Sequence, residues 1–215
     1  MSFSQEFLNE CEKLIEKIDF EEIEKVAECL RNVRDSGGRL FIVGSGGGAG
    51  HASHAVCDFR KLCNFEAYAP YDNISELTAR VNDEGWDVTI LNWLKVSRFN
   101  EKDCVFVFSV GGGSEEKKIS MNLVKVVRYA KEKNAKVVGI VGKDGGYTKK
   151  VGDAVVVLPT INSSHITPLT EGFQAVIWHL LVSHPKLQIN HAKWESTAID
   201  SSEKRVEYII KSLTT

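Results

Sequence analysis

The chain has 215 residues, of which 43% are hydrophobic and 26% are charged, and its formal net charge at pH 7 is −2. This length predicts a single domain with a full hydrophobic core. The near-neutral charge argues against nucleic acid as the main partner, and no apolar run approaches the roughly 20 residues that a membrane-spanning helix needs.

The first predicted elements are two amphipathic helices, over residues 7–18 and 20–33, where apolar side chains recur at helical spacing. The segment Asp35-Ser36-Gly37-Gly38 ends the second helix, with glycine as its C-terminal cap. Both helices precede the first strand. We therefore expect them to cover the sheet or to pack against another subunit.

From residue 38 onward, apolar strand-like runs alternate with helical stretches. Strands are predicted at 39–43, 65–68, 104–108, 136–141 and 154–158, and helices at 49–62, 73–81, 87–97, 115–134 and 169–184. Continuous apolar strands separated by helices are typical of a parallel sheet that is buried on both faces. The predicted fold is therefore α/β: a three-layer α/β/α sandwich around a parallel sheet of about five strands.

The organisation follows from this order of elements. A charged amphipathic helix is predicted over residues 196–213, so helices extend the core at both termini. We expect one domain over residues 1–215. It is divided into N-terminal helices (1–37), an α/β core (38–185) and a C-terminal helical extension (186–215).

Localisation is predicted from the first residues and from the cysteines. The segment Met1–Glu6 lacks the basic stretch and apolar run of a signal peptide. The five cysteines include no Cys-x-x-Cys pair and are Cys11, Cys29, Cys57, Cys63 and Cys104. An odd, scattered set is typical of inert thiols in a reducing compartment, so we expect a cytoplasmic protein.

Two glycine-rich loops, each directly after a predicted strand, are the main functional signal: Gly44-Ser45-Gly46-Gly47-Gly48-Ala49-Gly50 and Ser109-Val110-Gly111-Gly112-Gly113-Ser114. Glycine lets backbone N–H groups approach an anion, and a helix N-terminus adds partial positive charge. Ser109 and Ser114 add hydroxyl donors, although Ser114 would also serve as the N-cap of helix 115–134. Two such loops in one sheet indicate a phosphorylated small molecule at the carboxyl ends of the strands.

Dinucleotide binding is the alternative for the first loop, because Gly44 to Ala49 fit the pattern G-x-G-x-x-A. That pattern also needs an acidic residue about 20 positions later, at the end of the second strand. Glu66 has this spacing but begins its extended segment. The second glycine loop has no place in such a site, so the sequence favours a phosphorylated small molecule.

Two pairs of polar residues on predicted helices could carry chemistry. His54 and Asp58 are four residues apart and share one helix face, while Glu171 and His179 lie on the last core helix. Histidine and carboxylate together suit proton transfer or a divalent metal, and ordinary solvated helix residues are the alternative. Eight residues of helix span about 12 Å. Glu171 and His179 therefore share one ion only if the side chains reach far or subunits combine.

The order of elements and four segments resemble the sugar isomerase (SIS) domain, and within it the phosphoheptose isomerases, over about residues 5–185. The segments are Val43-Gly44-Ser45-Gly46-Gly47-Gly48, Val81-Asn82-Asp83-Glu84-Gly85-Trp86, Phe108-Ser109-Val110-Gly111-Gly112-Gly113-Ser114 and Val141-Gly142-Lys143-Asp144-Gly145-Gly146. The last helix adds Glu171 and His179.

The resemblance implies roles for individual residues. Asp58 falls at the position of the catalytic base and His179 at that of the acid. His54 and Glu171 would join them around a divalent metal, for which zinc suits two imidazoles and two carboxylates. A metal-free site with a protonated histidine is the alternative. The residues implied to bind substrate are Ser45, Gly46, Gly47, Gly48, Asp83, Ser109, Val110, Gly111, Ser114 and Glu171.

The sequence departs from the family pattern at several of these positions. The family usually has glutamate at Asp58, glutamine at Glu171, serine at Gly48 and Gly111, and threonine at Val110. Without those hydroxyls, phosphate binding is left to backbone N–H groups and to Ser45, Ser109 and Ser114.

The resemblance implies an aldose–ketose isomerase that acts on a sugar phosphate through an enediol. The substrate expected is sedoheptulose 7-phosphate, converted to a heptose 7-phosphate for surface polysaccharide. The resemblance also implies a homotetramer with sites between subunits, which the apolar stripes of the N-terminal helices support. A non-catalytic SIS protein that binds a sugar phosphate or regulates another protein is the alternative.

Overall fold

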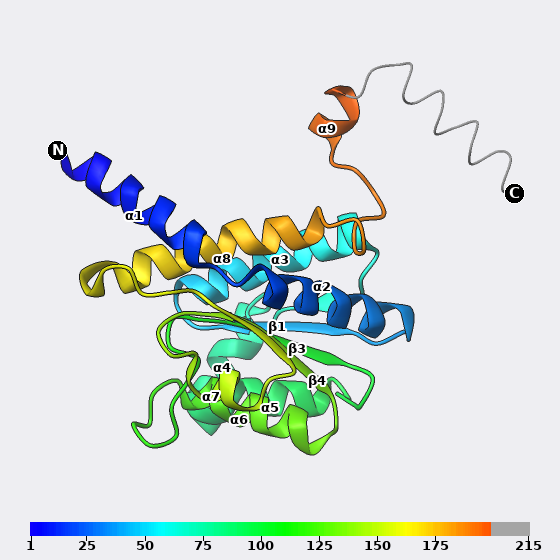
Figure 1. Cartoon of the computed structure of the whole chain (residues 1–215). Helices are drawn as coiled ribbons and strands as arrows, with labels where there is room; N and C mark the ends of the chain where they lie inside the picture. The colour runs from blue at the N-terminus through cyan, green and yellow to red at the C-terminus, as the bar shows by residue number, and fades with distance from the viewer. Residues whose placement is uncertain (199–215) are drawn as a thin grey trace, which may run out of the picture.

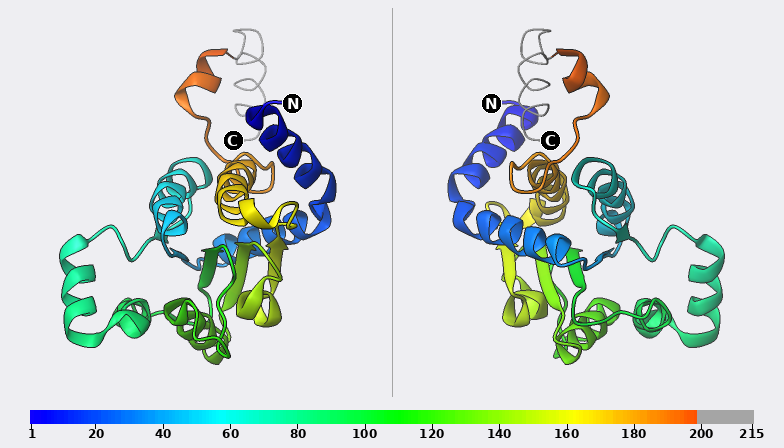
Figure 2. Two further views of the ribbon diagram at one scale, coloured as in Figure 1. Left: turned by 90° about the vertical axis from the view of Figure 1, so that its left-hand side faces the viewer. Right: turned by 90° about the vertical axis from the view of Figure 1, so that its right-hand side faces the viewer.

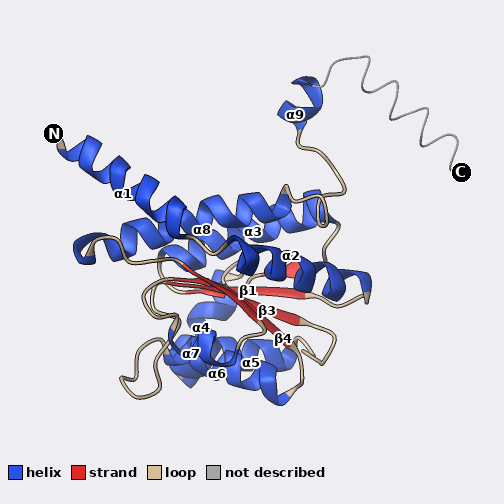
Figure 3. Ribbon diagram, in the orientation of Figure 1, coloured by secondary structure: helices blue, strands red, loops and turns tan. Residues whose placement is uncertain are grey.

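The computed structural model describes residues 1–198, and these form the predicted three-layer α/β/α sandwich (Figures 1 and 3). The strands are β1 (Leu40–Gly44), β2 (Ala67–Tyr68), β3 (Cys104–Ser109), β4 (Lys136–Val141) and β5 (Ala154–Val157). The helices are α1 (Phe3–Lys17), α2 (Phe20–Asp35), α3 (Gly47–Cys63), α4 (Ile74–Glu84), α5 (Trp86–Val96), α6 (Met121–Glu132), α7 (Gly146–Val151), α8 (Ile166–Val182) and α9 (Lys193–Ala198).

All five strands are parallel, in the order β2-β1-β3-β4-β5. Helices α2, α3 and α8 cover one face, and α5, α6 and α7 cover the other (Figure 1). The chain therefore leaves β1 toward one face and the adjacent β3 toward the other. In an open α/β sheet, this topological switch point is where a crevice forms at the carboxyl ends of the strands.

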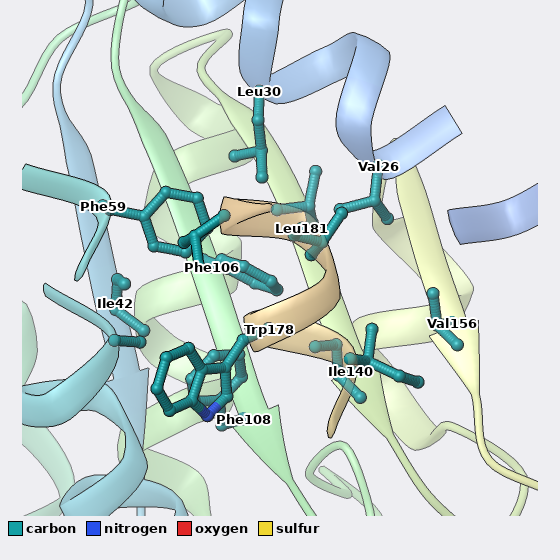
Figure 4. Close-up of a cluster of buried hydrophobic side chains, with 14 of the residues drawn as sticks. Val26, Leu30, Ile42, Phe59, Phe106, Phe108, Ile140, Val156, Trp178 and Leu181 are labelled. Carbon is teal, nitrogen blue, oxygen red and sulfur yellow. The ribbon is translucent and has the colours of Figure 1, made fainter. Parts of the chain in front are cut away.

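The core explains why these segments became strands. Every residue of β1 and β3 is buried, as expected for strands covered on both faces. Side chains of β1, β3 and β4 meet α2, α3 and α8 in one cluster, where Phe106, Phe108 and Trp178 are fully or almost fully buried (Figure 4). A second cluster lies on the other face, against α5 and α6.

The predicted helix over 115–134 is wrong at its N-terminal end, because α6 begins only at Met121. Residues 115–119 instead form a loop that a bridge between Ser114 and Ile119 closes. This segment has no apolar stripe to bury, whereas the buried apolar residues of α6 begin at Leu123. Ser114 is therefore not the N-cap; Ser120, with a left-handed backbone, holds that position.

Two further differences concern the edges of the core. Helix α7 was not predicted, because its six residues are too few to show an apolar period. The predicted C-terminal helix over 196–213 lies almost entirely outside the described residues. Within residues 1–198, no helix combines the length and the apolar character needed to cross a bilayer.

Helices α1 and α4, like the short α9, stand apart from the sandwich (Figure 1). α1 projects from one end of the molecule, and α4 has no buried residue and lies away from the sheet (Figure 2). Both carry exposed apolar side chains, among them Leu8 on α1 and Ile74 on α4. Within one copy, residues 1–198 leave these side chains exposed.

Candidate active site

Three of the four predicted metal ligands come together on the outer face of α3 and α8. The Nε2 atoms of His54 and His179 each lie 3.8 Å from Oδ2 of Asp58. One ligand atom from each residue can be chosen so that all three lie within 4.8 Å of one another. Ligands held at about 2.0–2.2 Å from a shared zinc ion are themselves roughly 3–4 Å apart, so this spacing fits one cation.

The local structure orients these three side chains. Nδ1 of His179 lies 2.7 Å from the carbonyl oxygen of Ala175, so Nδ1 carries the proton and donates it. Nε2 then faces Asp58 and is the ring nitrogen left to exchange a proton or to bind a metal. The His54 ring packs edge-on against the buried Trp178, with 4.7 Å between centroids.

Asp58 is the least exposed member of the cluster. Its side chain is 18% exposed, against 62% for His54 and 51% for His179. The two imidazoles are therefore open to solvent on the surface of the single chain, next to the exposed Val176 and Leu180 of α8. A site that excludes water here needs a further covering surface.

Glu171, the expected fourth ligand, lies elsewhere. A Cβ atom added to Gly47 would come within 2.4 Å of its Oε2, so the carboxylate rests directly on the first turn of α3. Gly47 precedes His54 by seven residues, or about 10 Å of helix. Glu171 therefore faces the positive end of α3, a favourable place for a carboxylate, and not the three clustered residues.

The glycine loops meet at the carboxyl edge of the sheet, as predicted. A Cβ atom on Gly48 would come within 2.5 Å of the carbonyl oxygen of Phe108, so the start of α3 packs on the end of β3. In the second loop, Ser109 Oγ accepts the N–H of Gly112, and the carbonyl of Val110 accepts the N–H of Gly142. The loops and the turn after β4 thus form one continuous rim.

A pocket of about 410 Å³ lies beside the second loop, between residues 111–119 and the turn after β4. Gly111, Ser114, Lys143 and Tyr147 are among its lining residues. A larger pocket of about 790 Å³ lies at the opposite edge, between α2 and the amino ends of the strands, where it includes Cys29 and Lys136. That pocket contains none of the predicted site residues.

Comparison with known proteins places these features in a family. The model of the SIS domain matches residues 3–142. The chain belongs to the SIS domain family.

Named relatives indicate the branch within this family. A probable phosphoheptose isomerase of Thermoplasma volcanium is 30% identical over 77% of this chain and 82% of its own length. The lincomycin biosynthesis protein LmbN of Streptomyces lincolnensis is 33% identical over 74% of this chain, which spans only 60% of that relative. The structure of a phosphoheptose isomerase from Neisseria gonorrhoeae has the same fold, with a TM-score of 0.71 and 21% identity over 84% of this chain and 94% of its own.

The structure accounts for one departure of this SIS domain from the family pattern. Serine does not fit at Gly48 without movement, because its Cβ would clash with a backbone carbonyl oxygen. Gly111 is different, since a Cβ there would meet only the Lys143 side chain, at 3.9 Å. The hydroxyl missing at Gly48 is thus excluded by packing, whereas the one missing at Gly111 is not.

Asp83 is not brought to the cluster within one chain. It lies exposed on α4, and Nδ2 of its neighbour Asn82 donates to its carboxylate. α4 stands away from α3 and α8 in both views of Figure 2. Asp83 can reach an active site only if α4 packs against the active site of a neighbouring copy.

Three polar residues near the glycine loops, Tyr71, Ser120 and Asn122, were not among the predicted site residues. Tyr71 donates its hydroxyl proton to the carbonyl of Gly44 and accepts the Gly44 N–H; burial raises the pKa of Tyr71, so that proton stays in place. Ser120 and Asn122 begin α6 beside the first loop. The last two were hidden inside a predicted helix, and only the spacing Ser-x-Asn before an apolar stripe could have pointed to them.

Proposed function

We propose that this member of the phosphoheptose isomerase branch interconverts a ketose phosphate and an aldose phosphate, with sedoheptulose 7-phosphate as the ketose. The observation that supports the proposal is the cluster of Asp58, His54 and His179 on α3 and α8. The N-terminus of α3 lies at the glycine loops, so the cluster and the loops are on the same side of the sheet. A sugar phosphate held by its phosphate at the rim would extend toward this cluster. The product would be a heptose 7-phosphate that supplies surface polysaccharide.

The chemistry is the transfer of a proton between neighbouring carbons. Asp58 would remove the proton next to the carbonyl, and His179 would give a proton from Nε2 to the carbonyl oxygen, forming an enediol. His179 would then take the proton of the neighbouring hydroxyl, whose oxygen becomes the new carbonyl oxygen. The hydrogen bond of His179 suits this role: because its Nδ1 proton is held by the Ala175 carbonyl, Nε2 is the ring nitrogen that would give and take the proton. Return of the proton to the adjacent carbon completes the isomerisation.

We also propose a divalent metal, zinc, at this cluster. Two imidazoles and one carboxylate are a donor set found in catalytic zinc sites, in which the fourth position remains open. His54, His179 and one carboxylate oxygen of Asp58 would hold it. When bound, the metal would polarise the substrate carbonyl in place of the Nε2 proton of His179, and the second oxygen of Asp58 would remain the base. With Glu171 at the start of α3, the described residues of one chain offer three protein ligands at this place.

The complete enzyme in this proposal is a cytoplasmic homotetramer of a single-domain chain with sites between subunits. The exposed apolar residues of α1, the detached α4 with Asp83, and the solvent-exposed imidazoles all support assembly. Five free cysteines support a reducing compartment.

Deuterium exchange tests this function directly. Sedoheptulose 7-phosphate incubated with the protein in D2O should gain deuterium at the carbon next to the carbonyl, and the aldose product should appear in NMR spectra. Asp58→Asn should abolish both while leaving sugar-phosphate binding largely intact, because one proton-transfer group is typically worth about 10²–10⁴-fold in rate. Binding without exchange in the unmodified protein would instead support the non-catalytic alternative.

A further inference from the structure

Asn122 is a buried amide that joins the first glycine loop to the start of α6. It lies in the first turn of α6 and is 0% exposed. Its Nδ2 donates to Oγ of Ser45, 3.2 Å away and 77 residues earlier in the chain. Its Oδ1 is buried and has no hydrogen-bond partner among the described residues.

The position of this pair is the switch point of the sheet. Ser45 directly follows β1, and Asn122 begins the helix that follows β3; these strands are adjacent, and their helices leave to opposite faces. Ser45 is half-buried at the resulting crevice, while Asn122 is sealed beneath it.

Packing does not account for an asparagine here. A buried carbonyl oxygen without a partner destabilises the folded state, and an apolar side chain would avoid that loss. The Nδ2 donor is the feature that an apolar residue could not supply.

The direction of the hydrogen bond determines what Ser45 can do. A serine hydroxyl has one proton and two lone pairs. Because Asn122 donates to the oxygen, one lone pair is used and the proton is free to point away from the protein. The N-terminus of α6 adds partial positive charge to the same region.

We propose that Asn122 is a positioning residue that holds the Ser45 hydroxyl as a hydrogen-bond donor to the phosphate of the substrate. The proposal rests on the proposed function for the identity of the phosphate as part of a sugar phosphate. Asn122 acts through Ser45 and does not itself touch the ligand. It also couples the loop after β1 to the helix after β3, so that both contribute to one anion site.

The first test is a double-mutant cycle read by phosphate binding. Dissociation constants for inorganic phosphate and for sedoheptulose 7-phosphate are measured for Ser45→Ala, Asn122→Ala and the double variant. A hydrogen bond to a charged group predicts about 10- to 100-fold weaker binding for Ser45→Ala. Asn122→Ala should weaken binding about 3- to 10-fold alone and by less than about twofold in the Ser45→Ala background.

The second test reverses the hydrogen bond without changing the shape. Asn122→Asp has no side-chain donor, so the Ser45 hydroxyl should turn inward and donate to the carboxylate. Phosphate affinity should then fall at least as far as in Ser45→Ala, and KM for the sugar phosphate should rise with less change in kcat. This near-isosteric variant also answers the question if Asn122→Ala fails to fold.

Asn100→Ala is the matched control. Asn100 lies before β3, at the amino edge of the sheet, and its side chain bonds to the backbone of Lys102 and Arg98. Its loss should lower the unfolding temperature without changing phosphate affinity. A purely structural role for Asn122 would make its variants behave like this control.

The outcomes separate the two proposals. Unchanged phosphate binding in Asn122→Asp and Asn122→Ala would overturn the positioning role even if the protein is an isomerase. Phosphate binding that depends on Ser45 and Asn122, without deuterium exchange, would overturn the isomerase function and leave the positioning role intact. A protein that binds neither inorganic phosphate nor the sugar phosphate would overturn both.

Discussion

Asp58 and the two histidines illustrate how a helix face becomes a reactive site. His54 and Asp58 share a face of α3 through their four-residue spacing, and His179 meets them because α8 packs alongside α3. One nitrogen of each imidazole and one oxygen of the carboxylate lie within 4.8 Å of one another. This is a residue-scale arrangement, and its consequences are testable one side chain at a time.

Metal content is the first prediction at this scale. Protein purified without chelator or affinity tag should contain about one equivalent of zinc, and His54→Ala should lose it. Even outer-shell partners are worth about 10–100-fold in metal affinity, so a ligand should be worth at least as much. His51→Ala is the control, because His51 lies on the same helix but faces Gln174. Elemental analysis showing no metal in the unmodified protein, with activity indifferent to chelators, would contradict the prediction.

The two glycines that stand where the family has serine give a second prediction. Gly111→Ser should fold normally and strengthen phosphate binding, because a Cβ at Gly111 meets nothing closer than 3.9 Å. Gly48→Ser should destabilise the fold by about 1–3 kcal/mol, because its Cβ must displace the backbone at Phe108. Urea unfolding and phosphate titration of both variants check this. Equal stability of the two would show that the contact at Gly48 relaxes freely.

At the scale of elements, α2 is tied to the edge of the sheet by one carboxylate. Glu22 accepts hydrogen bonds from Lys25 and Lys149 and, at 3.3 Å, from the N–H of Val155 in β5. β5 is the outermost strand, so this N–H has no partner strand on that side. The pKa of Glu22 lies below its ordinary value of 4.5, chiefly because of the Lys25 ammonium, with Lys149 and the Val155 N–H adding to it against the effect of burial.

Removing the charge of Glu22 should therefore destabilise the fold by an amount that depends on pH. Glu22→Gln should lower the free energy of unfolding by about 1–3 kcal/mol at pH 7. A carboxyl group whose pKa is lowered by folding stabilises above its unfolded pKa, and this contribution is lost as the pH falls through the folded value. The difference in the free energy of unfolding between the variant and the original protein should therefore become smaller below about pH 4.5.

Glu21→Gln provides the comparison for this measurement. Glu21 is its exposed neighbour in the first turn of α2 and makes no side-chain contact with β5 among the described residues. The free energy of unfolding of Glu21→Gln should stay within about 0.5 kcal/mol of that of the original protein. Denaturant unfolding at several pH values distinguishes the two. A Glu22→Gln effect that does not change with pH would contradict the assigned cause.

At the scale of the whole molecule, the single chain has more apolar surface on α1 than its own sandwich covers. Phe3 is 68% exposed, Leu8 62% and Phe20 62%, and all belong to the two N-terminal helices. Large apolar side chains exposed in this number on two helices support the proposed assembly. The exposed imidazoles and the detached α4 make assembly a condition for a closed active site in the proposed function.

Assembly is accordingly expected to control activity. The protein should elute as a tetramer of the 23.9 kDa chain, and Leu8→Glu should shift it toward smaller species with little isomerase activity. Lys17→Glu places the same side chain at another exposed position of α1 and should leave the assembly intact. Light scattering coupled to size-exclusion chromatography measures both. A fully active monomer would contradict the proposed sharing of sites.

The sequence alone predicted the parallel sheet, its flanking helices and the glycine loops, because apolar periodicity and glycine act over a few neighbouring residues. It also predicted that His54 and Asp58 share one face, since that depends only on helical pitch. It was wrong about residues 115–119, where a helix-compatible stretch has nothing to pack against.

Which distant residues meet depends on how the helices and strands pack together in the tertiary structure. Glu171 was expected beside His179, yet the packing of α8 on the start of α3 places it on Gly47. The contact between Asn122 and Ser45 depends on β1 and β3 being neighbours, which no local pattern records. Local interactions select helices and strands, whereas burial of their apolar faces selects the order of strands and hence the composition of the site.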